Sequence, residues 1–324
     1  MSLHCFFLTA MKTPVRSVLS TQLFWAFLFF SGLGEATLNA QGAFKMSGGS
    51  SPSASALSYQ LDAESSFFGR GGTNAGSTNF GNITEISSSA SFVSSAQVRD
   101  TVLLRLGVEW QRYSFDPESR SPVPDSLQGL DLAIGADLQV SPAVLLRVEA
   151  HPGIYSEFSG VSWQDFNVPF EVAATYFVSS DLLLIAGIYV DVNSDLPVFP
   201  VVGVHWKLSD KWLIEGIAPR PQIQYLLSDN VTLFAGADLR EATFRVNEDF
   251  GQSRGIPKLN DAILEYFEIR AGAGLTWKIS KNFNLDVEGG GTPYRRFEYP
   301  RADGYKVKSE DLVPYLRIAL SAKF

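Results

Sequence analysis

The sequence predicts an all-β protein, a closed antiparallel transmembrane β-barrel of about fourteen strands. Three observations predict this fold. Apolar and polar side chains alternate in runs of about ten residues, short polar turns alternate with longer loops, and aromatic side chains stand near the ends of the apolar faces. Successive side chains of a strand point to opposite faces of the sheet, so each run has one apolar and one polar face.

The stretch LVPYLRIALSAKF at the C-terminus, residues 312–324, shows the alternation most clearly. Leu316, Ile318 and Leu320 share one face, whereas Arg317 and Lys323 lie on the other. A soluble edge strand with so apolar a face would be an aggregation hazard. In a barrel, lipid covers this face and pairing with the first strand removes the free edge.

The same alternation recurs upstream, and its breaks divide the chain into strands. Clear examples are residues 101–111, 129–140, 230–240, 264–280 and 281–290. Tight polar turns are expected at 99–100, 141–142, 179–181, 209–211, 228–230 and 280–282. Longer connections are expected at 69–82, 115–126, 151–166, 192–197, 247–262 and 297–311, with a short PRP link after Ala218. An even count of about fourteen strands fits a single-chain bacterial barrel, and twelve is the alternative if the Ser-rich hairpin at 56–97 does not span.

The first part of the chain has the pattern of a signal peptide. Lys12 and Arg16 precede the apolar run LFWAFLFFSGLG, and a small-residue cleavage site precedes Gln41. Residues 1–40 are therefore expected to be a cleaved signal peptide, with Met1 or Met11 as the start and an uncleaved anchor as the alternative. Residues 41–55 are expected to be a flexible segment, and residues 56–324 to form the barrel.

A soluble β-sandwich is the main competing fold, because it also alternates. Two features favour the membrane barrel. The charges gather on the polar faces, and the outward aromatics stand near strand ends, where girdles form at the two membrane interfaces. These aromatics are Trp110, Tyr176, Trp206, Trp212, Tyr225 and Trp277. The expected location is therefore a bacterial outer membrane, in contact with its lipid.

The stretch 208–239, with its LSDKW turn, PRP link and LSDN turn, resembles the core of a porin-like family of outer-membrane barrels described only as a domain of unknown function. The resemblance implies a fold and a location but no activity. The C-terminal pattern, in particular Tyr315, Leu320 and Phe324, resembles the signal of bacterial outer-membrane proteins. That resemblance implies recognition by the barrel-assembly machinery.

The polar parity defines the expected lining of the lumen, where a function would reside. These residues are Arg105, Glu109, Asp131, Asp137, Arg147, Glu171, His205, Lys207, Asp238, Arg240, Glu268, Arg270, Asp286, Glu288 and Arg317. Two interpretations compete. The charges line a water-filled channel, or they pair across the barrel and close it.

Other chemistry has little support in the sequence. The net charge of −8 excludes a basic nucleic-acid surface, and the single cysteine, Cys5, lies in the predicted signal peptide. No pair of histidines has metal-ligand spacing, so neither a metal nor another cofactor is expected. His151, near Glu149 and Glu157 at the outer end of a strand, is the one candidate for an outer-rim hydrolase, and a polar structural role is the simpler interpretation.

The sequence thus predicts a protein that is not an enzyme. The leading hypothesis is a passive, porin-like channel for small hydrophilic solutes. The alternatives are a structural or adhesive barrel with a closed lumen and the outer-rim hydrolase. The solute and the oligomeric state are left open.

Overall fold

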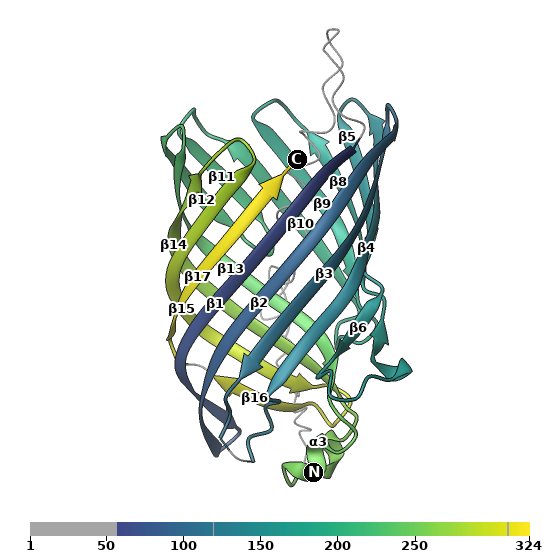
Figure 1. Cartoon of the computed structure of the whole chain (residues 1–324), viewed down its shortest axis with the longest axis vertical. Helices are drawn as coiled ribbons and strands as arrows, with labels where there is room; N and C mark the ends of the chain where they lie inside the picture. Colours follow the sequence, from purple (N-terminus) through teal and green to yellow (C-terminus); the bar gives the residue numbers. More distant parts are fainter. Residues whose placement is uncertain (1–56, 119, 310) are drawn as a thin grey trace, which may run out of the picture.

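The computed structural model describes residues 57–118, 120–309 and 311–324, which form one closed antiparallel β-barrel (Figure 1). The expected signal peptide, residues 1–40, and the segment 41–55 lie outside the described residues. Fourteen long strands make the wall: β1 (Leu57–Ala75), β2 (Thr78–Arg99), β3 (Val102–Phe115), β4 (Ser126–Ser141), β5 (Val144–Ala150), β8 (Phe170–Phe177), β9 (Leu182–Val190), β10 (Val198–Lys207), β11 (Trp212–Ile217), β12 (Gln222–Ser228), β13 (Val231–Arg245), β14 (Ile263–Lys278), β15 (Phe283–Tyr299) and β17 (Val313–Lys323).

The connections contain the remaining elements. Three short strands, β6 (Gly153–Ser156), β7 (Phe166–Asn167) and β16 (Tyr305–Ser309), and three short helices, η1 (Trp163–Asp165), α3 (Phe250–Ser253) and η2 (Pro257–Leu259), lie there. In the part of the chain that the structure describes, no helix has the length and apolarity needed to cross a membrane.

The first hairpin decides the strand count, because it closes the barrel. β1 pairs with β2 along its length and with β17 from Gln60↔Lys323 to Phe68↔Tyr315. The Ser-rich hairpin therefore spans, and the prediction of fourteen strands is confirmed over the alternative of twelve. Backbone pairing satisfies every strand edge in such a ring, as lipid requires.

The two ends of the barrel differ in their connections. The six predicted tight turns all join wall strands at one end, called the turn end, where β17 also finishes (Figure 1). The longer connections and α3 lie at the opposite end, the loop end. One expected loop is wrong: instead of a connection over 69–82, β1 runs to Ala75 and β2 begins at Thr78. The register shifts between Phe68 and Gly71 and again between Gly72 and Asn74, and Gly76, at φ 60°, makes a tight turn that favours glycine.

The outer surface is apolar and the inner surface is polar, as the alternation predicts. Leu104, Leu106 and Val108 of β3 are exposed, whereas Arg105 between them is buried. An apolar outer band of this kind is typical of barrels that stand in lipid. Trp206, Trp212, Trp277 and Tyr176 are exposed near the turn end and match the expected girdle, whereas Trp110 lies within β3.

Candidate functional site: a charged cavity in the lumen

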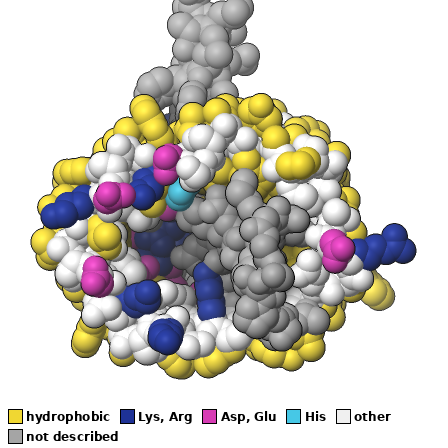
Figure 2. Space-filling model, turned by 90° about the horizontal axis from the view of Figure 1, so that it is seen from above, with side chains coloured by type: hydrophobic (Ala, Val, Ile, Leu, Met, Phe, Trp, Pro, Cys, Tyr) yellow, Lys and Arg dark blue, Asp and Glu magenta, His cyan; other side chains and the backbone are white. Residues whose placement is uncertain are grey.

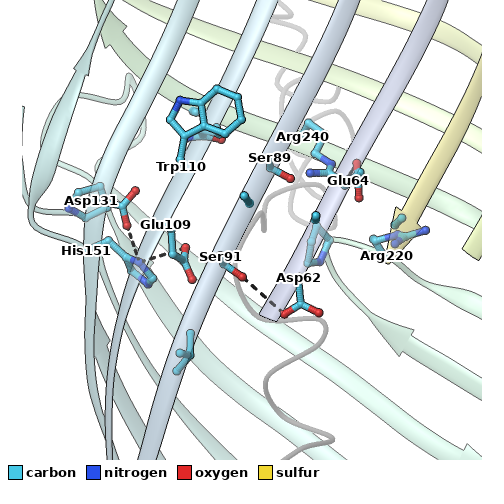
Figure 3. Close-up of a pocket in the computed structure, with 18 of the residues that line it drawn as sticks. Asp62, Glu64, Ser89, Ser91, Glu109, Trp110, Asp131, His151, Arg220 and Arg240 are labelled. Carbon is cyan, nitrogen blue, oxygen red and sulfur yellow. Dashed lines mark hydrogen bonds and ion pairs between the residues drawn. The ribbon is translucent and has the colours of Figure 1, made fainter. Parts of the chain in front are cut away.

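The lumen contains a cavity of about 260 Å³ whose walls include many charged side chains. Seen from the turn end, the molecule is hollowed, with hydrophobic side chains on the outer rim and charged side chains inside (Figure 2). Two walls face each other across the cavity. An acidic wall comes from β3, β4, β5 and β8, and an arginine wall comes from β1, β13, β17 and the link after Ala218 (Figure 3).

The acidic wall contains a cluster of Glu109, Asp131 and His151. Glu109 of β3 lies directly opposite Asp131 of β4, so two carboxylates share one face at neighbouring positions. Like charges directly opposite one another destabilise a sheet. The imidazole of His151 lies between them: its Nδ1 is 3.3 Å from Asp131 Oδ1 and 3.7 Å from Glu109 Oε2 (Figure 3).

The chain direction after β5 places His151 in this position. Asp131 pairs with Gly153 at the start of β6, two residues beyond His151. A Cβ atom at Gly153 would lie 2.4 Å from the Cβ of Asp131, so the absence of a side chain makes room for that carboxylate. The backbone N–H of His151 donates to the carbonyl of Pro169, 2.8 Å away, and this bond fixes the residue against the next connection.

A second pair of carboxylates extends the acidic wall. Glu149 of β5 lies directly opposite Glu171 of β8, and both are buried. The Nε of Arg105 donates to Glu149 Oε2 at 2.6 Å, and Glu149 Oε1 lies 3.6 Å from His151 Nε2. Oε1 of Glu171 is buried and has no hydrogen-bond partner among the described residues.

The arginine wall is organised around Glu64 of β1. Its Oε1 accepts a bond of 2.8 Å from Arg240, and its Oε2 lies 2.7 Å from Nε of Arg317. Arg220, in the PRP link, donates to Glu288 of β15 at 2.8 Å. These arginines are held by carboxylates on both sides, which fixes their side chains against the cavity.

This wall continues toward the loop end as a buried ion-pair layer. Its members are Glu64, Glu85, Asp238, Glu268, Glu288, Arg220, Arg240, Arg270, Arg295 and Arg317. Arg270 is fully buried and contacts Glu268, with its Nε 2.6 Å from Oε1. Its guanidinium also lies 4.6 Å from the ring centre of Phe68, a cation–π geometry.

Beyond the ion-pair layer, an aromatic core fills the loop end of the lumen between β3, β13, β14 and β15. It consists of the buried side chains Tyr113, Phe115, Phe244, Tyr266, Phe297 and Tyr299. Tyr113 and Tyr266 have ring centres 4.7 Å apart, and the ring of Phe115 lies edge-on to Phe297 at 5.1 Å. The connection that carries α3 and η2 covers this core with Phe250 and Leu259.

The predicted lumen residues fall into three groups. Those that line the cavity are Arg105, Glu109, Asp131, Glu171, Arg240, Asp286 and Arg317. Those buried in ion pairs outside it are Asp137 with Arg147, and Asp238, Glu268, Arg270 and Glu288. His205 and Lys207 lie near the turn end, where exposed Lys207 pairs with Asp210 at the rim. Whether the first group lines a conducting path stays a prediction.

Several site residues were missed from the sequence. Glu64 and Glu85 lie on the first hairpin and have the inward parity of their strands, so the alternation itself was the available signal. Arg220 lies in a link, where alternation gives no information. The inward aromatics of the loop end share the lumen parity of the charged residues, and nothing in a single strand separates a filling side chain from a lining one.

His151 and the C-terminal residues also differ from expectation in their surroundings. The imidazole of His151 points into the lumen cavity rather than standing at an outer rim. Glu109, Asp131 and His151 each offer one ligand atom within 4.8 Å of the others, although no spacing along the sequence indicated a metal site. Of the assembly-signal residues, Tyr315 is buried in the lumen against Glu288, whereas Leu320 and Phe324 face outward.

Comparison with known proteins gives one family and several barrels. The family model described as "Domain of unknown function (DUF6268)" matches residues 77–310. No curated protein matches the chain.

Among solved structures, an outer membrane channel from Pseudomonas putida F1 has 10% identity and a TM-score of 0.47, with 84% of this chain and 97% of that chain covered. The TodX monoaromatic hydrocarbon channel deltaS2 mutant has 8% identity and a TM-score of 0.45, with 84% and 90% covered. The Ralstonia pickettii toluene transporter TbuX has 10% identity and a TM-score of 0.36, with the same coverage. Because each TM-score is below 0.5, what these proteins transport says nothing about this chain.

Proposed function

The chain belongs to the family described as Domain of unknown function (DUF6268), as the resemblance of residues 208–239 predicted. We propose that the protein is a passive, porin-like channel for small hydrophilic solutes in a bacterial outer membrane. The closed barrel, the apolar outer band and the girdle at the turn end support the membrane location. The signal-peptide pattern of residues 1–40 supports export across the inner membrane. The function proposed is transport and includes no catalytic step.

The cavity of about 260 Å³ is the observation that carries this proposal. Side chains alone fill the interior of a small barrel. A lumen that served only stability would be filled in the same way and would not contain a chamber of this size. The walls of the chamber contain both carboxylates and guanidinium groups. Walls of both signs favour small polar or zwitterionic solutes over a strong preference for one sign of ion.

Transport through the lumen requires the loop end to open. In this structure the aromatic core and the α3 connection fill the lumen there. A solute that enters from the turn end therefore reaches the cavity first and crosses only when a loop-end segment moves. Such a channel opens in brief, separate events, in contrast to a wide pore that conducts continuously.

The structural barrel with a closed lumen is the second candidate, and one observation favours it. The ion-pair layer brings five carboxylates together with five guanidinium groups, which is the balanced cross-strand pairing expected of a closed lumen. A layer of ion pairs stiffens the barrel and leaves little free charge to attract ions.

Single-channel recording separates the two candidates. Refolded protein is placed in a planar bilayer and compared with Asp286→Asn, which removes a half-buried cavity charge, and with Leu106→Ala on the outer face as a control. We expect brief conductance steps whose ratio of cation to anion permeability is lower in Asp286→Asn than in the wild type and unchanged in Leu106→Ala. A silent bilayer, from protein shown to be folded by heat-dependent gel mobility, would leave the closed structural barrel as the function.

A further inference from the structure

We infer that Glu109, Asp131 and His151 bind a divalent transition-metal ion, with zinc as the best fit, in the acidic wall of the lumen cavity. The three residues come from β3, β4 and the start of the connection after β5, and the pairing of these neighbouring strands brings them together. A metal ion can bind in this position whether or not the barrel conducts. Binding of such an ion would also identify one solute that enters the lumen.

The distances within the cluster match those between the ligands of one metal ion. Ligand bonds of about 2.0–2.2 Å to zinc, in a tetrahedral arrangement, place the ligand atoms roughly 3.3–3.6 Å apart. His151 Nδ1 lies 3.3 Å from Asp131 Oδ1 and 3.7 Å from Glu109 Oε2. Two of the three separations therefore match such a site, and all three ligand atoms lie within 4.8 Å of one another.

The other ring nitrogen of His151 faces a carboxylate at ion-pair distance, which is longer than a hydrogen bond. A histidine that binds a metal through one nitrogen donates the N–H of the other to a carboxylate or carbonyl, which fixes the tautomer and the ring. His151 Nε2 faces Glu149 Oε1 at 3.6 Å. Glu149 is itself held by Arg105 at 2.6 Å, so the carboxylate, the imidazole and the ligand atom form a connected series.

The negative charge of the acidic wall favours binding of a cation. Four carboxylates, those of Glu109, Asp131, Glu149 and Glu171, face each other in two directly opposed pairs. Arg105 neutralises one of them. Glu171 is 2% exposed, lines the cavity, and keeps Oε1 without a hydrogen-bond partner in the described part of the chain. A protonated His151 supplies one charge, whereas a divalent ion supplies two at the point where the carboxylates converge.

The ligand set selects the class of metal. One imidazole nitrogen with two carboxylates suits zinc and its neighbours among the divalent transition metals. Calcium and magnesium prefer oxygen ligands, so the imidazole disfavours them. The side chain of Glu109 is 36% exposed toward the cavity, which leaves a coordination position open to water or a passing solute. An open position of this kind allows the ion to exchange.

Isothermal titration calorimetry tests the site directly. Refolded, tag-free protein in detergent, cleared of metal with a chelator, is titrated with zinc chloride beside the variants His151→Gln and Glu109→Gln. Asp286→Asn, on β15 and outside the Glu109, Asp131 and His151 cluster, is the matched control because it also removes one cavity carboxylate. We expect one zinc ion per chain in the wild type and in Asp286→Asn, and at least a tenfold weaker affinity in each of the other two variants.

Two outcomes would overturn the site. One is the absence of saturable heat in the folded wild type, and the other is equal affinity in His151→Gln and the wild type. Folding of each variant is checked by heat-dependent gel mobility, and Glu109→Gln, which alters a half-exposed side chain, keeps the test valid if His151→Gln fails to fold. Calcium chloride serves as a second probe, and displacement of zinc by equimolar calcium would also contradict a transition-metal site.

A conductance measurement keeps the site separate from the proposed channel. If the wild type conducts, micromolar zinc at the turn end should reduce its current and leave that of His151→Gln unchanged. If no conductance is seen while calorimetry shows one zinc ion bound per chain, the metal site is supported and the channel function is contradicted. If the wild type conducts and binds no zinc, the channel function is supported and the metal site is contradicted.

Discussion

Tyr266 donates a hydrogen bond of 3.0 Å to the Glu85 carboxylate, and this bond joins the aromatic core to the ion-pair layer. Both residues are almost completely buried. The bond links β14 to β2 across the lumen, between strands that are not neighbours in the barrel wall. The aromatic core and the ion-pair layer at the loop end therefore form one connected structure, and a substitution in either should change the stability of the other.

Tyr266→Phe should destabilise the barrel. It keeps the ring contacts with Tyr113 and Phe297 but removes the donor to Glu85, which leaves a buried carboxylate oxygen without that partner. A lost partner of this kind costs about 1–3 kcal/mol. Urea unfolding of the refolded barrel, followed by tryptophan fluorescence, measures the change.

Tyr176→Phe is the control for that measurement, because the Tyr176 hydroxyl stands on the exposed outer surface. Its midpoint should equal that of the wild type. If Tyr266→Phe also unfolds at the wild-type midpoint, the hydroxyl has no stabilising role in the closure.

Arg270→Met should have a larger effect. The side chain is fully buried and contacts Glu268 directly, so its removal leaves five carboxylates in the layer with four guanidinium groups. Breaking a buried ion pair from one side typically costs about 3–5 kcal/mol. The unfolding midpoint in urea should fall accordingly.

Adding Glu268→Gln to Arg270→Met tests the cause. The double variant restores the balance of charge, so part of the lost stability should return. An unfolding midpoint lower than that of Arg270→Met would show that the loss came from altered side-chain contacts and not from an unpaired charge.

The wall of the barrel could be predicted from the sequence because period-two alternation is local. Each strand reports its own inward and outward faces, and polar turns mark its ends, so the strands and the tight turns follow from the chain alone. The expected connection over 69–82 is wrong because glycine and serine are common in loops, whereas here Gly71 and Gly72 pair with Ile83 and Asn82 in a continuing hairpin.

The site could be predicted only residue by residue. Glu109 and Asp131 were each placed in the lumen by parity, but their direct opposition depends on the register between β3 and β4. A slip of one residue would place one of them in lipid, and no single strand contains that information. The same limit hid the aromatic core, since Tyr113 and Tyr266 meet only after the barrel closes.

The stability of the loop end should depend on pH through Glu157, which lies in the connection between β6 and η1. Burial, the largest cause, and the nearby charge of Asp125 raise the pKa of this carboxyl, whereas the bonds from Asn247 and the charge of Arg254 lower it. The net effect is a rise of the pKa from the usual 4.5 to about 7. The folded protein therefore binds a proton more tightly than the unfolded chain. The contribution of Glu157 to stability is greatest below pH 4.5, falls as the pH rises toward 7, and is constant above it.

Glu157→Gln should remove this dependence, since the amide does not titrate. Unfolding midpoints of the wild type and the variant, measured from pH 5 to pH 8, give the comparison. The wild-type midpoint should fall over this range by more than that of Glu157→Gln. Parallel curves would show that the carboxyl titrates alike in the folded and unfolded chains.

Phe324 should matter for assembly in the cell more than for the finished barrel. Its backbone exchanges two hydrogen bonds with Tyr59, of 2.9 and 3.0 Å, and its exposed ring lies edge-on to Phe283 at 5.6 Å. Phe324→Ala keeps the backbone bonds and loses the ring, so refolding in detergent should be close to that of the wild type. If the ring is part of the signal for the assembly machinery, the folded fraction in cell envelopes should fall severalfold. Phe283→Ala is the matched control, because it removes the same ring contact but leaves the C-terminal pattern unchanged; equal losses in the two variants would assign the effect to the contact and not to the signal.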